Sequence, residues 1–413
     1  MTAARLECEP RGSAAHAPQV LYVGEFPPSN HHGGAILIRR LLEGHPADRL
    51  SVITSTGGMK ASRATGLFEC RHITVPLFGG ARALGMRPLV RAFNGLGVAL
   101  VALRAIMEIR HKRVEALITI VQGRYYLAAA LAAWATATPH ITIVHDSFIS
   151  ANSTPSNLLR RALRYLTQKT LRSAAHVYAV SPEMQSLVLR ECGAGSEIQL
   201  PSSTLSPHAE GQAQNSRECS PVILFAGTTG YTVRDCLDLL ADMIATGQLK
   251  AKLHLCTAMT ETEMQKFGRN CDNIVCRGWV SQSELQEAFS SADILFLPYS
   301  FLESSREAVE TAFPSKIADY LAAGKPILVF GPRYSSLVRY TSEQGFAEVV
   351  DEFSAAALAR GIQKIVFSPL YKEKLAARAL EVFSANHDIR CQQEKFYLTL
   401  ERIVRRSHSC PGG

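Results

Sequence analysis

The chain has 413 residues, of which 47% are hydrophobic and 19% are charged. This composition is typical of an ordered globular protein, and the length favours two domains with a core in each. The formal net charge of +8 suits anionic ligands such as nucleotide diphosphates or acidic lipid. Because no nucleic-acid-binding motif accompanies the positive charge, we expect no nucleic acid partner.

The termini and the cysteines indicate a cytoplasmic protein. Residues 1–18 are polar, lack the apolar core of a signal peptide and are expected to be disordered, and residues 407–413 are expected to form a flexible tail. No apolar run reaches the roughly 18–20 residues that span a bilayer. The ten cysteines are scattered without a C-x-x-C pair, which favours free thiols in a reducing compartment.

Strands and helices alternate through residues 19–200, which are predicted to form a first domain. Strands are expected at 20–24, 50–54, 72–75, 116–121, 139–144 and 175–180, and helices at 35–42, 81–113, 124–137, 157–172 and from Pro182 onward. The rest of 55–80 is expected to be loop. Such alternation predicts a parallel sheet with helices on both of its faces.

A glycine-containing loop is predicted between the first strand and the first helix. Gly33 and Gly34 would let the backbone approach a ligand closely, although the segment lacks the G-x-G-x-x-G pattern of a dinucleotide site. His31 and His32 precede them, but no third ligand lies at a fitting spacing. We therefore expect no metal.

His145 follows a predicted buried strand and is a candidate catalytic residue. Functional side chains of parallel sheets come from the carboxyl ends of strands, and His145 lies at such an end. Alternatively, it is a loop histidine that hydrogen-bonds Asp146.

Residues 201–220 are rich in Pro, Ser and Gln and are interpreted as an interdomain linker. A second domain is predicted at 221–385. Its strands are expected at 222–227, 252–256, 274–280, 294–298, 327–330 and 349–350, and its helices at 233–245, after Ser281, at 355–367 and at 371–383. Ser281 and Glu284 have the spacing of a capping box. Residues 300–314 are read as loop, and 386–406 as a final helix.

The segment 311–332 carries the strongest functional signal. Ser315 is expected to cap a helix that Gly324 ends, and a buried strand follows. A helix N-terminus at the carboxyl end of a parallel sheet attracts phosphate, and Lys316 adds a full positive charge. Asp319, one turn further on, is a candidate acceptor of hydrogen bonds from ribose hydroxyls.

Two motifs resemble the GT-B glycosyltransferases, in particular the retaining family 4. They are PSKIADYLAAGKPIL at 314–328 and the pattern that runs from GWV to AFSSADILFLP at 278–298. The resemblance extends over residues 19–405. It implies an α/β protein of two doubly wound Rossmann-like domains that face a central cleft, with the helix at 386–406 crossing back to the first domain.

The resemblance also implies a retaining transfer of a sugar from a nucleotide-diphosphate sugar. It needs no metal or cofactor, and the leaving phosphate helps to deprotonate the acceptor. His145 and Lys316 would be catalytic. The donor would be bound by Gly33, Gly34, Gly227, Thr228, Thr229, Gly278, Trp279, Val280, Pro314, Ser315, Lys316, Ile317 and Asp319. Trp279 stacks on the base or, alternatively, fills core.

Two positions depart from the family pattern. Thr311 stands where a second carboxylate usually contacts the donor sugar, and Glu310 is one residue away. Thr228 and Thr229 stand in a loop that often carries Arg and Lys, which leaves Lys316 and Arg234 as available cations. These departures keep a catalytically inactive, nucleotide-sugar-binding relative as the main alternative. A nucleotide-sugar 2-epimerase is a second alternative.

Two basic segments concern the acceptor. Residues 81–113 and 157–172 interleave arginines and lysines with apolar residues, as interfacial helices on anionic lipid do. They would place the protein on the inner face of a membrane, with a lipid-linked acceptor in polysaccharide or glycoconjugate biosynthesis. Alternatively, the helices face the core, their arginines are solvated, and the acceptor is a free saccharide or small molecule.

Overall fold

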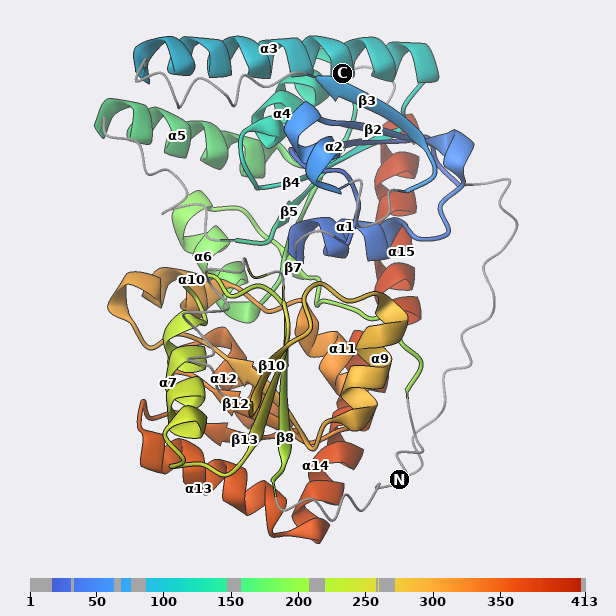
Figure 1. Ribbon diagram of the computed structural model, residues 1–413. Helices are drawn as coiled ribbons and strands as arrows, with labels where there is room; N and C mark the ends of the chain where they lie inside the picture. The colour runs from blue at the N-terminus through green and yellow to red at the C-terminus, as the bar shows by residue number, and fades with distance from the viewer. Residues whose placement is uncertain are drawn as a thin grey trace. The chain divides into compact units, whose positions relative to one another are not determined.

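The computed structural model describes residues 17–409, apart from 31–32, 63–67, 76–86, 147–156, 208–219, 258 and 260–271. The chain divides into two compact units (Figure 1). Unit 1 comprises the residues up to Leu200 and those from Ile389 onward, and unit 2 comprises Pro201–Asp388. Each unit is an α/β body built on a sheet of its own.

Unit 1 contains a seven-stranded parallel sheet in the order β3-β2-β1-β4-β5-β6-β7. The strands are β1 (Val20–Val23), β2 (Leu50–Ser55), β3 (Arg71–Val75), β4 (Ala116–Ile120), β5 (His140–Val144), β6 (His176–Ala179) and β7 (Glu197–Ile198). β1, β2, β4 and β5 are buried along their whole length, as expected of a parallel sheet covered on both faces. The strand order reverses at β1, which pairs with both β2 and β4.

The helices of unit 1 are α1 (Gly33–Leu42), α2 (Thr56–Ser62), α3 (Arg87–Lys112), α4 (Tyr125–Thr136), α5 (Asn157–Ser173), α6 (Pro182–Cys192) and α15 (Ile389–Ser409). Small residues let α3 and α4 pack closely on the sheet, since Ala105, Ala128 and Ala132 share a core with Leu21 and Val23. α15 returns to unit 1 from the other end of the chain. Its buried Gln392 accepts a 2.7 Å hydrogen bond from Gln199.

Unit 2 contains a six-stranded parallel sheet in the order β10-β9-β8-β11-β12-β13. The strands are β8 (Val222–Ala226), β9 (Lys252–Cys256), β10 (Ile274–Cys276), β11 (Ile294–Pro298), β12 (Ile327–Phe330) and β13 (Ala347–Val350). The helices are α7 (Arg234–Ala245), α9 (Gln282–Ser291), α10 (Arg306–Thr311), α11 (Lys316–Ala322), α12 (Ser336–Gln344), α13 (Ala355–Val366) and α14 (Pro369–Val382), followed by a π-helix at Phe383–His387. Here the strand order reverses at β8, between β9 and β11.

The expected α/β class with two doubly wound sheets is confirmed. The helix ends also follow local chemistry: Ser281 and Glu284 form the capping box expected before α9, and Ser181 caps α6 with Pro182 in its first turn. Three local expectations were wrong. Residues 55–80 include the helix α2, residues 300–314 include a 3-10 turn at Glu303–Ser305 and the helix α10, and α12 was not predicted.

Candidate functional site

Lys316 lies at the point of unit 2 where the strand order reverses, and such points are where doubly wound sheets bind ligands. Its ammonium nitrogen is 3.8 Å from the centroid of the Phe225 ring on β8. Among the described residues, none hydrogen-bonds this nitrogen or pairs with it. Burial in this apolar setting lowers the pKa of Lys316 to about 7, so a bound anion would stabilise its charged form.

The turn after β8 leaves room for the Lys316 side chain. Gly227 has a φ of +134°, and a Cβ at this position would lie 3.0 Å from the Lys316 nitrogen. Only glycine adopts this conformation easily and keeps the space open. Thr228 is exposed and Thr229 is half-buried in the same loop. Gly227 therefore leaves the space beside the amine open, and the hydroxyl-bearing Thr228 and Thr229 follow it in the same loop.

Tyr320 fixes the helix that carries Lys316. Its hydroxyl accepts a hydrogen bond from the Ala226 nitrogen at 2.8 Å and donates one to the Phe296 carbonyl at 3.3 Å. These bonds hold α11 against the end of β8 and the middle of β11. The spacing of Tyr320 with Ile317 and Leu321 predicts an apolar helix face, and that pattern does not reveal the role of the hydroxyl.

Two expectations about cations and caps were wrong. Ser315 occupies the N-cap position of α11, but its backbone is helical and its side chain forms no capping hydrogen bond. Arg234 is not an available cation, because Asp238 holds it at 2.9 and 3.0 Å. Since α11 has only seven residues, the full charge of Lys316 matters more for a phosphate than the helix end does.

Asp319 lies on the next turn of α11. One of its carboxylate oxygens accepts a 2.5 Å hydrogen bond from the hydroxyl of Ser203, at the start of unit 2. Thr311, in the position of the missing carboxylate, is buried, and its hydroxyl donates to the Glu307 carbonyl at 3.1 Å. Glu310 is half-buried.

The turn after β10 bears an exposed aromatic side chain. Gly278 has a φ of +71°, and the Trp279 side chain that follows is 49% exposed. The alternative in which Trp279 fills core is therefore wrong. Val280 is half-buried beside it.

In unit 1, Gly33 and Gly34 form the first turn of α1 and not a loop, while His31 and His32 lie outside the described residues. His145 directly follows β5, and its Nδ1 is 3.0 Å from the Asp146 carboxylate. Burial disfavours the charged imidazole, but the Asp146 carboxylate outweighs it and raises the pKa of His145. This contact is the one named in the alternative interpretation, in which His145 is a loop histidine, and a catalytic role of His145 stays a prediction.

The structure adds Glu25, which the sequence analysis overlooked, at the reversal point of unit 1. Its carbonyl accepts hydrogen bonds at 2.8 Å from the hydroxyls of both Thr54 and Ser55. Its carboxylate lies against the turn after β4, where a Cβ on Gly123 would be 1.5 Å from Oε2. The signal available in the sequence was a carboxylate directly after the first buried strand.

The comparisons with known families agree with this geometry. The family model described as glycosyl transferases group 1 matches residues 220–367, and the model of Glycosyltransferase Family 4 matches residues 32–200. The two matches together cover most of the described chain. The chain belongs to the group 1, family 4 glycosyltransferases. The resemblance inferred from the motifs is thereby confirmed.

Solved structures share the fold of this glycosyltransferase along nearly its whole length. HepE of Anabaena, in complex with UDP and glucose, is 12% identical with a TM-score of 0.64, over 93% of this chain and 99% of HepE. Sucrose-phosphate synthase of Thermosynechococcus elongatus is 15% identical with a TM-score of 0.65, over 93% and 98% of the two chains. Trehalose 6-phosphate synthase of Burkholderia multivorans is 11% identical with a TM-score of 0.64, over 96% and 100%. Comparison with curated proteins gives no match.

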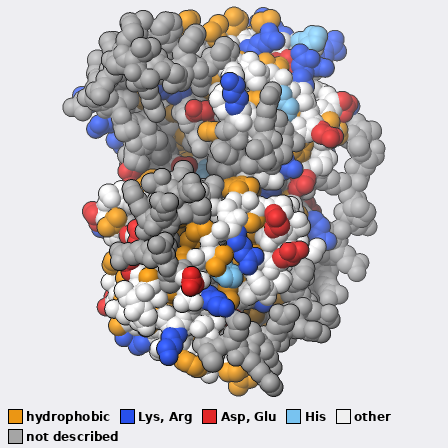
Figure 2. Space-filling view, viewed as in Figure 1, with side chains coloured by type: hydrophobic (Ala, Val, Ile, Leu, Met, Phe, Trp, Pro, Cys, Tyr) orange, Lys and Arg blue, Asp and Glu red, His pale blue; other side chains and the backbone are white. Residues whose placement is uncertain are grey.

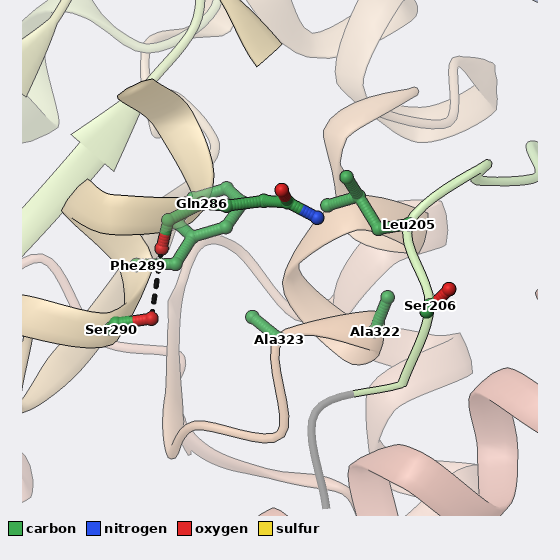
Figure 3. Close-up of a pocket in the computed structure, with 7 residues that line it drawn as sticks. All are labelled: Leu205, Ser206, Gln286, Phe289, Ser290, Ala322 and Ala323. Carbon is green, nitrogen blue, oxygen red and sulfur yellow. Dashed lines mark hydrogen bonds between the residues drawn. The ribbon is translucent and has the colours of Figure 1, made fainter. Parts of the chain in front are cut away.

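A small hollow in unit 2 of the glycosyltransferase is shown in Figure 3. It encloses about 20 Å³ and is lined by Leu205, Ser206, Gln286, Phe289, Ser290, Ala322 and Ala323. These residues belong to the start of unit 2 and to the C-terminal parts of α9 and α11. None of them is a predicted site residue, and the hollow carries no titratable side chain.

Proposed function

We propose that this glycosyltransferase takes its sugar from a nucleotide-diphosphate sugar and transfers it with retention at C1, without a metal ion. The observation that carries the proposal is the Lys316 ammonium on the Phe225 ring beside Gly227. The same fold in HepE was determined in complex with UDP and with UDP-glucose. Family membership supports retention, and the sequence contains no Asp-x-Asp motif for a metal.

The proposed chemistry follows from where charge develops. When the bond between the sugar and the diphosphate breaks, negative charge builds on the leaving phosphate. A fixed cation in a water-poor site stabilises that charge more than it stabilises the ground state. Lys316 would supply the cation, Asp319 would accept from the ribose hydroxyls, and Trp279 would stack on the base. His145 would contact the donor sugar, and the leaving phosphate would take the acceptor proton.

A nucleotide-release screen tests this proposal. The purified protein is incubated with UDP- and GDP-sugars in the presence of EDTA, and the anomeric configuration of any product is read by NMR. We expect nucleotide release with at least one donor and a product with the donor's configuration. Strict dependence on Mg²⁺ or Mn²⁺ would contradict metal independence, and inversion at C1 would contradict retention.

A catalytically inactive relative remains the competing function, because Thr311 replaces the carboxylate expected at the donor sugar. Such a protein would bind a nucleotide without releasing it from any sugar. Binding of UDP or GDP by calorimetry, together with no turnover of any donor in the screen, would support this alternative. Turnover of any donor would exclude it.

We further propose an acceptor carried on an anionic lipid surface, which would make the protein peripheral on the inner face of a membrane. Along α3, the side chains of Leu96, Leu100, Leu103 and Met107 are 43–56% exposed at a spacing that places them on one helix face. Figure 2 shows hydrophobic and basic side chains along the edge where α3 lies. On α4, which packs on α3, Leu131 is 50% and Trp134 is 83% exposed.

Basic residues accompany this apolar stripe. Arg104, Arg110 and His111 of α3 and Arg160 and Arg161 of α5 are all exposed. Each basic residue near anionic lipid contributes about 1 kcal/mol, and exposed leucines insert at the lipid boundary. Residues 81–86 of the basic segment lie outside the described residues. Among the described residues, no helix is both long enough and apolar enough to cross a bilayer.

Cosedimentation with liposomes tests the lipid surface. We expect binding to anionic vesicles at low salt, weaker binding at high salt, and loss in a Leu100→Glu/Leu103→Glu variant. A matched control is Leu398→Glu on α15, which replaces a single leucine that is 61% exposed outside the stripe. Equal binding to neutral vesicles, or none at low salt, would favour a soluble saccharide acceptor.

A further inference from the structure

Ser203 occupies an unusual position because one small side chain contacts both the donor-site helix and the chain segments that join the units. The residue is only 1% exposed. It is the third residue of unit 2, and Asp388, with which it forms a β-bridge, is the last residue before the chain returns to unit 1.

The direction of the Ser203 hydrogen bond follows from its two partners. The Leu205 backbone nitrogen can only donate, and it lies 3.1 Å from Ser203 Oγ. Asp319 Oδ1 lies 2.5 Å from the same oxygen. The hydroxyl therefore accepts from Leu205 and gives its own proton to the carboxylate. A hydrogen bond to an ionised group is short and strong, so Ser203 fixes the orientation of the Asp319 carboxylate.

The segment just before the chain returns to unit 1 also fixes the Ser203 backbone. Its nitrogen donates to the His387 carbonyl at 3.0 Å. The His387 ring, which is fully buried, lies 2.6 Å from the Pro201 carbonyl through Nδ1 and 2.9 Å from the Tyr340 hydroxyl through Nε2. A carbonyl can only accept, so Nδ1 carries the proton and Nε2 accepts from Tyr340. Burial lowers the pKa of His387 to about 4, which keeps this neutral arrangement at physiological pH.

We propose that Ser203 is a positioning residue for the donor nucleotide: its hydroxyl orients the Asp319 carboxylate toward the ribose, and its backbone anchors that orientation to both segments that join the units. The inference rests on the proposed function, in which Asp319 accepts from ribose hydroxyls. It assigns the recognition of the ribose to two residues that are 116 positions apart in the chain, where the family motif alone contains only Asp319.

Calorimetry with UDP and its 2′,3′-dideoxy analogue, or with GDP and its analogue, separates positioning from packing. We expect the wild-type protein to bind the ribose form about tenfold more tightly, since a hydrogen bond to a charged group contributes about that factor. In Ser203→Ala this ratio should fall to about two, through weaker binding of the ribose form alone. Ser203→Thr, which keeps a hydroxyl, should retain the tenfold ratio.

Thr204→Ala is the matched control. Thr204 is the adjacent residue, and its hydroxyl accepts from Gln282 on α9 at 2.8 Å without contacting Asp319. It should keep the wild-type ratio. An unchanged ratio in Ser203→Ala, or an equal loss for both nucleotides, would overturn the inference. Wild-type protein that binds neither UDP nor GDP would instead overturn the proposed donor, and wild-type binding without a preference for ribose would overturn the role of Asp319.

Discussion

The carboxyl edges of the two sheets present opposite charges at corresponding places. In unit 1, Glu25 follows the reversal strand β1; its carbonyl accepts hydrogen bonds from the end of β2, and its carboxylate lies against Gly123 in the turn after β4. In unit 2, Gly227 directly follows the reversal strand β8, and the Lys316 amine fills the space beside it. A carboxylate repels a diphosphate and accepts hydrogen bonds from sugar hydroxyls. An ammonium attracts a diphosphate and can only donate hydrogen bonds. The comparison favours a diphosphate in unit 2 and an uncharged hydroxyl-bearing ligand in unit 1.

The largest expected effect tests the cation of unit 2. Lys316→Ala should lower kcat/KM for nucleotide release by a factor equivalent to about 2–4 kcal/mol, because the charge on the leaving phosphate loses its partner. Lys325→Ala is the control, since this lysine lies nine residues further along the chain and donates to the Ser290 carbonyl on α9 at 2.7 Å. Equal activity of Lys316→Ala and wild type would show that the phosphate binds elsewhere.

The free energy of unfolding tests whether the Glu25 carboxylate is fixed against Gly123. Gly123→Ala should reduce the free energy of unfolding by about 2–3 kcal/mol, because the position has a φ of +62° and the new Cβ would meet Glu25 at 1.5 Å. Gly195→Ala provides the control, since nothing lies within 4 Å of a Cβ there. Denaturant titration of both variants measures the difference. Similar midpoints would contradict a fixed Glu25.

A smaller effect is expected at the hydroxyl that holds α11. Tyr320→Phe should reduce the free energy of unfolding by about 1–2 kcal/mol, because the buried Ala226 nitrogen loses its acceptor. It should also weaken UDP binding, since α11 carries Lys316. Thermal unfolding and calorimetry measure the two effects. Stability and affinity both at the wild-type level would show that Tyr320 does not position the helix.

The smallest effect concerns pH. The pKa of Lys316 is lowered to about 7, so the free protein carries the ammonium mainly below pH 7, and a bound diphosphate favours that charged form. Affinity for UDP should therefore fall as pH rises above 7, by at most about tenfold per pH unit. Lys316→Arg, which stays charged throughout, should show only the titration of the nucleotide itself. Identical pH profiles for both proteins would contradict the lowered pKa.

Sequence patterns captured the features that depend on neighbouring residues. Unbroken apolar runs identified the buried strands, the spacing of Ser281 and Glu284 identified a capping box, and Gly324, with a φ of +60°, follows the end of α11 as expected. The motif also pointed to Lys316 and Asp319. Such signals are local because helix caps and strand burial are decided within a few residues.

Contacts between distant residues could not be read from the same patterns. The hydrogen bond from Ser203 to Asp319, the approach of Glu25 to Gly123 and the Tyr320 hydroxyl bonds all depend on how strands and helices are brought together. The pairing of Arg234 with Asp238 is different, because an i, i+4 pair on a helix was open to prediction. Whether any of the predicted site residues, Lys316 and Asp319 included, contacts the donor stays a prediction.

The return of α15 to unit 1 has a consequence for the order of synthesis. Phe396, Leu400 and Ile403 of this helix are buried, yet all 188 residues of unit 2, Pro201–Asp388, are translated before them. Unit 2 is contiguous in the chain, so it can complete its fold on the ribosome while unit 1 still lacks its last helix. During translation, the apolar surface of unit 1 that α15 covers therefore stays exposed until this last helix is synthesised. A stop codon that removes α15 would leave that surface permanently open and direct the product towards aggregation or proteolysis, even though the donor-site residues of unit 2 would all be present.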